Sequence, residues 1–100
     1  MMKIDELSWL QEWYLAQCDG DWEHESGVEI GTLDNPGWHI EVDLVRTGLE
    51  DASFTPEKVE RTPIDWFSCE VARGKFKAFC GPRNLSEVIA VFRKWADEPR

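Results

Sequence analysis

Apolar and polar residues alternate strictly over residues 38–44. The apolar positions are Trp38, Ile40, Val42 and Leu44, and the polar ones between them are His39, Glu41 and Asp43. This two-residue period is the signature of a strand with one buried and one solvated face. Residues 34–37 read Asp-Asn-Pro-Gly, which is typical of a turn because proline presets φ and glycine permits positive φ. A similar alternation precedes the turn, so the segment predicts a hairpin with strands near Val28–Leu33 and Trp38–Val45.

The same period recurs between residues 65 and 80. It predicts strands at Asp65–Arg73 and Lys75–Cys80, joined at Gly74 by a connection short enough for a second hairpin. Lys75 and Lys77 fall on the solvated side, where lysines discourage edge-to-edge pairing with another sheet. Another short strand is predicted at Lys58–Arg61, which Pro63 should end or confine to an edge.

Helical periodicity is found near the two ends of the chain. Asp5–Cys18 reads as a helix with Asp5 as its N-cap. A second apolar stripe follows Asn84, which we expect to cap that helix together with Glu87 in a capping box. The stripe consists of Leu85, Val88, Ile89, Phe92, Trp95 and Ala96. The order predicts an α+β fold in one domain over residues 1–100, with an antiparallel sheet of four to five strands flanked by an N-terminal and a C-terminal helix.

The net charge of −9 is unevenly distributed. Residues 1–57 hold 14 acidic and 2 basic residues, whereas residues 58–100 hold 6 acidic and 9 basic ones. Nucleic-acid binding needs Lys and Arg to displace counterions, so we expect no nucleic-acid partner. An acidic half suits a basic protein partner, whose approach it would steer, although solubility alone also accounts for such a charge.

Three features predict a cytoplasmic protein. No apolar run approaches the ~18 residues of a membrane span, so we expect no membrane association. Charges recur too early in residues 1–6 for a secretory signal. The cysteines, Cys18, Cys69 and Cys80, are odd in number and widely spaced, which favours free thiols over disulfides or a zinc site.

The most unusual polar run is residues 19–25. It holds four carboxylates, Asp19, Asp21, Glu23 and Glu25, together with Trp22 and His24. The spacing matches no calcium-binding loop, and one histidine does not define a zinc site, so we expect no metal and no cofactor. We interpret the run as a solvated loop or a charged contact surface, in which Trp22 either fills the core or anchors a partner. The alternative is a small enzyme or metal-binding protein that uses this acidic cluster with His24, although no catalytic motif occurs in the chain.

Several short motifs extend over nearly the whole chain. The N-terminal half has L-Q-E-W-Y at 10–14, Q-C-D-G-D-W-E-H at 17–24, L-D-N-P-G-W at 33–38 and D-L at 43–44. The C-terminal half has D-W at 65–66, K-F at 75–76, G-P-x-N-L at 81–85 and F-x-x-W at 92–95. In this order they resemble the immunity protein 53 family of bacterial polymorphic toxin systems. The resemblance implies a small cytoplasmic α+β protein that binds and blocks a cognate toxin without catalysis.

These observations predict a partner-binding surface in the acidic half. The residues expected to contact the toxin are Asp19, Asp21, Trp22, Glu23 and Glu25. Glu29, Glu41 and Asp43, on the solvated face of the first hairpin, are a second candidate. If the toxin is a nuclease, its cleft would be basic, and the carboxylates could stand in for phosphates. The identity of the toxin and the oligomeric state stay open.

Overall fold

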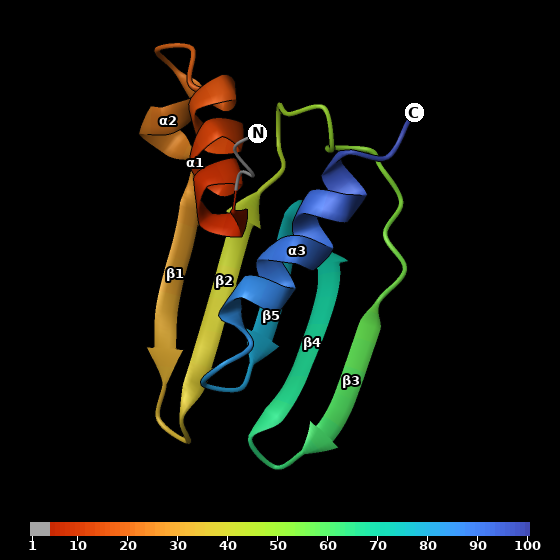
Figure 1. Cartoon of the computed structure of the whole chain (residues 1–100). Helices are drawn as coiled ribbons and strands as arrows, with labels where there is room; N and C mark the ends of the chain where they lie inside the picture. The colour runs from red at the N-terminus through yellow and green to blue at the C-terminus, as the bar shows by residue number, and fades with distance from the viewer. Residues whose placement is uncertain (1–4) are drawn as a thin grey trace.

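A computed structural model describes residues 5–100 (Figure 1). The prediction that residues 1–6 form no secretory signal falls largely on residues outside this range. The elements in chain order are α1 (Glu6–Gln17), α2 (Trp22–Glu25), β1 (Val28–Leu33), β2 (Gly37–Asp43), β3 (Glu57–Thr62), β4 (Asp65–Ala72), β5 (Lys75–Cys80) and α3 (Leu85–Ala96). All strand pairs are antiparallel, in the order β1-β2-β5-β4-β3. The predicted α+β fold with terminal helices is confirmed.

The sheet consists of two local units joined by one long-range ladder. β1 and β2 form a hairpin, and β3, β4 and β5 form a meander. β2 then pairs with β5, with Ile40 opposite Ala78 and Glu41 opposite Lys77. β5 is therefore central, and the expectation that Lys75 and Lys77 protect a sheet edge is wrong.

Both long helices lie on one face of the sheet (Figure 1). α1 packs against α3, and α3 packs against β5. The core between the layers is strongly aromatic: the ring centroid of Phe76 lies 4.9 Å from that of Phe92 and 5.6 Å from that of Phe54. Phe76 and Phe92 are completely buried. Burial of such rings removes roughly 150–250 Å² each from water, so this cluster holds the helices on the sheet.

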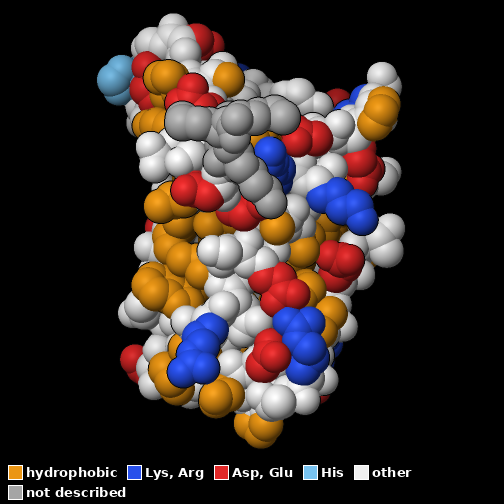
Figure 2. All heavy atoms as spheres, viewed as in Figure 1, with side chains coloured by type: hydrophobic (Ala, Val, Ile, Leu, Met, Phe, Trp, Pro, Cys, Tyr) orange, Lys and Arg blue, Asp and Glu red, His pale blue; other side chains and the backbone are white. Residues whose placement is uncertain are grey.

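The helices leave part of their own face open near β1 and β2. Figure 2 shows hydrophobic side chains gathered at the left of this face. Ile30 of β1 is 37% exposed there, and Trp38 is only partly buried. No helix among residues 5–100 has the length and hydropathy needed to cross a membrane.

The N-terminal ends of α1 and α3 are capped differently. Asp5 caps α1 as predicted, because its carboxylate accepts the Ser8 N–H at 2.7 Å. Asn84 occupies the N-cap position of α3, but its side chain makes no capping bond. Its amide nitrogen donates to Asp65 at 2.9 Å and to Glu87 at 3.0 Å. Since Asn84 is buried, the predicted capping box is replaced by a polar joint between β4 and α3.

Candidate functional site

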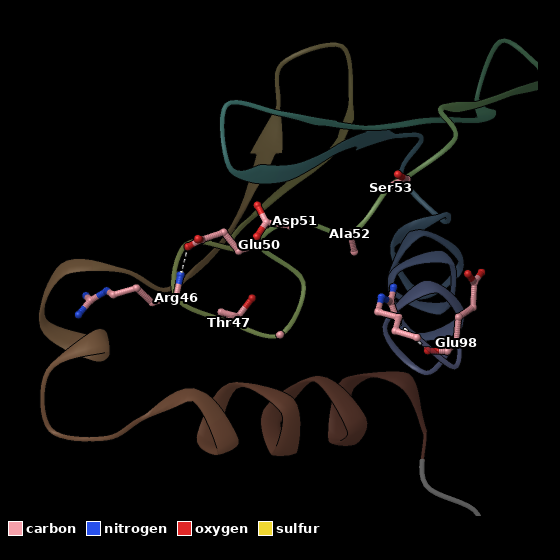
Figure 3. Close-up of a pocket in the computed structure, with 9 residues that line it drawn as sticks. Arg46, Thr47, Glu50, Asp51, Ala52, Ser53 and Glu98 are labelled. Atoms are coloured by element: carbon pink, nitrogen blue, oxygen red, sulfur yellow. Dashed lines mark hydrogen bonds between the residues drawn. The ribbon is translucent and has the colours of Figure 1, made fainter.

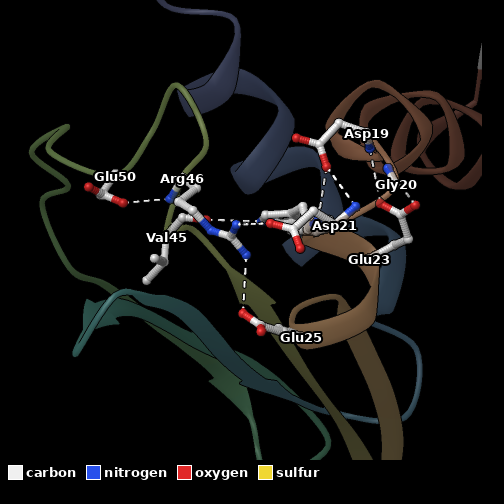
Figure 4. A network of polar contacts seen from close by, with 9 residues as sticks. Asp19, Gly20, Asp21, Glu23, Glu25, Val45, Arg46 and Glu50 are labelled. Atoms are coloured by element: carbon white, nitrogen blue, oxygen red, sulfur yellow. Dashed lines mark hydrogen bonds and ion pairs between the residues drawn. The ribbon is translucent and has the colours of Figure 1, made fainter.

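The acidic run of residues 19–25 is a tight turn followed by the four-residue helix α2, not a fully solvated loop (Figure 4). Gly20 makes the turn possible with φ of +92°. One Asp19 oxygen accepts the backbone N–H groups of Trp22 at 2.9 Å and Asp21 at 3.0 Å. These two hydrogen bonds, that from Trp22 first, lower the pKa of the Asp19 carboxyl.

Glu23 closes the same turn from the other side. Its two oxygens accept the N–H groups of Asp19 at 3.0 Å and Gly20 at 2.8 Å. Hydrogen bonds from its own backbone N–H and then from those of Asp19 and Gly20 lower the pKa of Glu23. Two of the four predicted contact carboxylates therefore also hold the local backbone in place.

Trp22 is buried, with 1% of its surface exposed. Its indole N–H donates to the Val45 carbonyl oxygen at 2.9 Å, and its ring meets Trp13 edge-on with centroids 6.4 Å apart. Of the two interpretations of this residue, the structure shows the one in which it fills the core. Any contact with a partner at this end of the molecule is thus made by the side chains around Trp22.

Asp21 and Glu25 are exposed, as Asp19 is, and both form an ion pair. Both approach Arg46: the closest N···O distances are 2.7 Å for Asp21 and 3.4 Å for Glu25 (Figure 4). Their side chains remain 71% and 74% exposed. Arg46 is held in left-handed conformation with φ of 63°, and its backbone N–H donates to Glu50. The Arg46 guanidinium thus pairs with both carboxylates, and the three side chains together keep a net negative charge.

Arg46 was missed as a part of this cluster by the sequence analysis. The only signal was its isolation, since it is the single basic residue between Lys3 and Lys58. The hydrogen bond that Arg46 donates to Asp21, followed by the charges of Asp21 and Glu25, raises the pKa of Arg46. The cation therefore stays charged whenever the carboxylates around it are ionised.

The second candidate set lies on the sheet face opposite the helices. The Lys77 Nζ is 3.8 Å from a Glu41 oxygen, and the Lys75 Nζ is 3.6 Å from an Asp43 oxygen. Asp43 also accepts the Gly27 N–H at 2.9 Å. Because Gly27 follows α2 closely in the chain, this bond places the acidic cluster next to the edge of that sheet face. The two candidate surfaces are therefore neighbours.

A cleft with a volume of about 540 Å³ lies between the loop at residues 46–53 and the C-terminal end of α3 (Figure 3). Its charged lining residues are Arg46, Glu50, Asp51, Glu98 and Arg100. Arg100 is engaged with the helix end, since its guanidinium donates to the Trp95 carbonyl oxygen at 2.7 Å. The lining has no cysteine or histidine, so it offers none of the usual thiol–imidazole pairs for nucleophilic chemistry.

The remaining reactive side chains are dispersed. Within residues 5–100, no three His, Cys, Asp or Glu residues are grouped as metal ligands would be. Cys69 and Cys80 are buried free thiols, and burial raises the pKa of Cys69 to about 12. That thiol stays protonated at neutral pH and is a poor nucleophile. His24 is exposed on α2.

The family model for immunity protein 53 matches residues 7–97 of the chain. The chain belongs to this family. Neither a curated protein nor a solved structure matches it. The match spans both carboxylate clusters and every helix and strand of the structure except the first residue of α1. Membership in an immunity protein family implies a toxin protein as partner.

Several residues of the immunity protein 53 motifs have structural roles in this chain. The Trp38 indole N–H donates to the Pro82 carbonyl oxygen at 3.1 Å, joining N-P-G-W to G-P-x-N-L. A Cβ atom added to Gly37 would lie 2.2 Å from the Cys80 carbonyl oxygen, so only glycine fits there. N-P-G-W and G-P-x-N-L therefore stabilise the fold, and we look for the toxin-binding surface outside these two motifs.

Proposed function

We propose that this protein binds and neutralises a cognate toxin protein in the cytoplasm, through an acidic surface and without catalysis. Family membership supports the immunity function. The surface rests on one observation: Asp21 and Glu25 are both more than 70% exposed and share a single cation, Arg46. Asp19 and Glu23 hold these two side chains in position by fixing the turn.

The chemistry of this surface suits a basic partner. Carboxylates of fixed position attract a cationic cleft over long range and accelerate encounter. In contact, a toxin Arg or Lys would join or replace Arg46 between Asp21 and Glu25. A toxin that acts on phosphates would have its active site occluded by such groups.

Co-expression tests the function directly. The toxin domain encoded next to the gene would be produced in a bacterial host with and without this chain. We expect growth only when the chain is present. Continued growth arrest in the presence of the folded wild-type chain would contradict the proposal.

The surface is tested by association kinetics. The double variant Asp21→Asn/Glu25→Gln should bind the toxin domain with an on-rate about tenfold lower than wild type, and with a weaker salt dependence. The matched control is Asp34→Asn/Glu57→Gln, which removes two exposed carboxylates elsewhere and should change the on-rate by about twofold or less. Equal effects of the two pairs would mean that net charge alone steers the encounter.

A further inference from the structure

The sheet face opposite α1 and α3 has no helix packed on it within residues 5–100. The strand registers place one residue from each strand in a row across this face. The row is Gly31, His39, Phe79, Ser68 and Lys58, from β1 to β3. We call this side of the sheet the open face. An uncovered face with a large aromatic residue on its central strand differs from an ordinary solvated face, which carries polar side chains.

Phe79 lies at the middle of this row and is 43% exposed. Its ring centroid is 6.5 Å from that of His39, with the rings inclined at 36°. His39 in turn lies over Gly31, because a Cβ atom there would come within 2.4 Å of its Nε2. Trp66 is on the same face, two residues before the partner of Phe79. The aromatic surface is therefore held in place by its neighbours before any partner arrives.

The charges around Phe79 are mostly paired. The three lysines of the open face each lie near a carboxylate: Lys58 is 3.3 Å from Glu60, Lys75 is 3.6 Å from Asp43, and Lys77 is 3.8 Å from Glu41. Glu29 and Glu70 make no ion pair with any residue of the described part of the chain, and both are exposed. The open face therefore carries two surplus negative charges.

Glu29 and Glu70 stand in one row, with Glu41 and Lys77 between them. Three strand spacings separate them, which corresponds to about 14 Å. Phe79 belongs to the next row of the same face. A complementary partner would present an apolar side chain to Phe79 and basic groups on either side of it.

We propose that the open face is a docking surface for the toxin protein, which seats an apolar side chain against Phe79 and His39 and places basic residues opposite Glu29 and Glu70. The identity of the partner rests on the function proposed above. The face adjoins the acidic cluster through the bond from Gly27 to Asp43. A second copy of the chain fits less well, because its open face would carry the same surplus of negative charge.

The size of the open face agrees with this role. Five strands of six to eight residues span about 24 Å by 20–26 Å, or roughly 500–600 Å² in projection. A standard protein interface buries about 800 Å² on each partner. The open face together with the neighbouring carboxylates of α2 would provide that area.

The decisive variant is Phe79→Thr, which keeps a residue suited to a strand and removes the ring. Its matched control is Ile30→Thr, an apolar position of similar exposure (37% against 43%) on the opposite face of the same sheet. Binding of the toxin domain encoded beside the gene would be measured by calorimetry. We expect affinity to fall about 30-fold or more for Phe79→Thr, as for a central aromatic anchor, and by about twofold or less for Ile30→Thr.

Charge reversal provides a second readout. Glu29→Lys/Glu70→Lys should slow association about tenfold or more, because like charges would then meet. Glu57→Lys, on the same sheet but on the helix side, is the control and should have a much smaller effect. Thermal unfolding of every variant would establish that each is folded.

Three outcomes would overturn the inference. Wild-type affinity in Phe79→Thr would show that the ring is not a docking residue, and a loss confined to Ile30→Thr would assign the partner to the helix side. A wild-type dimer that Phe79→Thr dissociates would assign the open face to a second copy. In each case the wild type can still bind and neutralise the toxin. A wild-type chain that does not bind the toxin would instead overturn the proposed function together with this inference.

Discussion

Phe76 and Phe79 lie three residues apart on β5 and face opposite sides of the sheet. Phe76 is fully buried beneath α3, in contact with the rings of Phe54, Phe92 and Trp95. Phe79 is 43% exposed and has His39 as its aromatic neighbour. The same strand thus supports two surfaces of different chemistry. Burial of apolar side chains on the helix side stabilises the fold, whereas the open face is accessible to a partner.

The difference shows how one sheet can separate a stabilising face from an open face. The helices stabilise the sheet from one side, so the open face can vary without loss of the core. We expect substitutions on the open face to reduce stability less than substitutions in the core.

Phe76→Ala should reduce the free energy of unfolding by about 3–5 kcal/mol, because it removes a completely buried ring from the centre of the core. Urea denaturation followed by tryptophan fluorescence would measure the loss. A cost near zero would mean that the helix side is not the stabilising side.

Gly37→Ala should reduce the free energy of unfolding by about 1–3 kcal/mol, since the new methyl group would lie 2.2 Å from the backbone oxygen of Cys80. Gly31→Ala is the matched substitution on β1. There the obstructing atom belongs to the His39 side chain, which can rotate away, so the cost should be smaller. If the two variants were equally unstable, His39 would be as rigid as the backbone.

The polar joint between the layers should make stability depend on acid pH. The hydrogen bonds from Arg61 and then Asn84 lower the pKa of Asp65 below its ordinary value of 3.8. The ionised carboxylate therefore stabilises the fold above that value, and this contribution is lost as the pH falls through the lowered pKa. Asp65→Asn should be less stable than wild type at pH 7, and the difference should shrink below about pH 4. Melting temperatures across pH 2–7 would follow it, with Asp34→Asn as the control.

Phe79→Thr should change the free energy of unfolding by about 0.5 kcal/mol or less, the smallest effect in the series. The ring rests on the surface, and threonine suits a strand. The measurement is the same urea denaturation as for Phe76→Ala. A large loss of stability would show that the open face is part of the folding core and would remove the contrast between the two phenylalanines.

Much of the fold follows from local patterns in the sequence. Period-two alternation located β1 and β5 at their observed bounds, and Asp5 began α1 as predicted. Alternation does not determine which strands become neighbours across the sheet, so β5 was not expected at the centre. The ladder between β2 and β5 depends on long-range packing that local spacing does not encode.

The acidic run shows a different limit. Four carboxylates near Trp22 resemble a solvated loop in the sequence, because the hydrogen bonds that nearby backbone N–H groups donate to Asp19 and Glu23 leave no signal in composition. The sequence left open whether Trp22 is buried and gave no sign of the contribution of Arg46, since both depend on the loop after β2. The candidate residues could be named from the sequence, but not which carboxylates accept backbone N–H groups and which pair with Arg46.

The ladder between β2 and β5 has a consequence for kinetics. The β1–β2 hairpin and the β3–β5 meander can each form locally, whereas their union must close a long chain segment and should come late in folding. His39 and Phe79 lie on opposite sides of that junction and touch across it. A partner seated on both would hold the two units together. We therefore expect the bound protein to unfold more slowly than the free one and to resist proteolysis for longer.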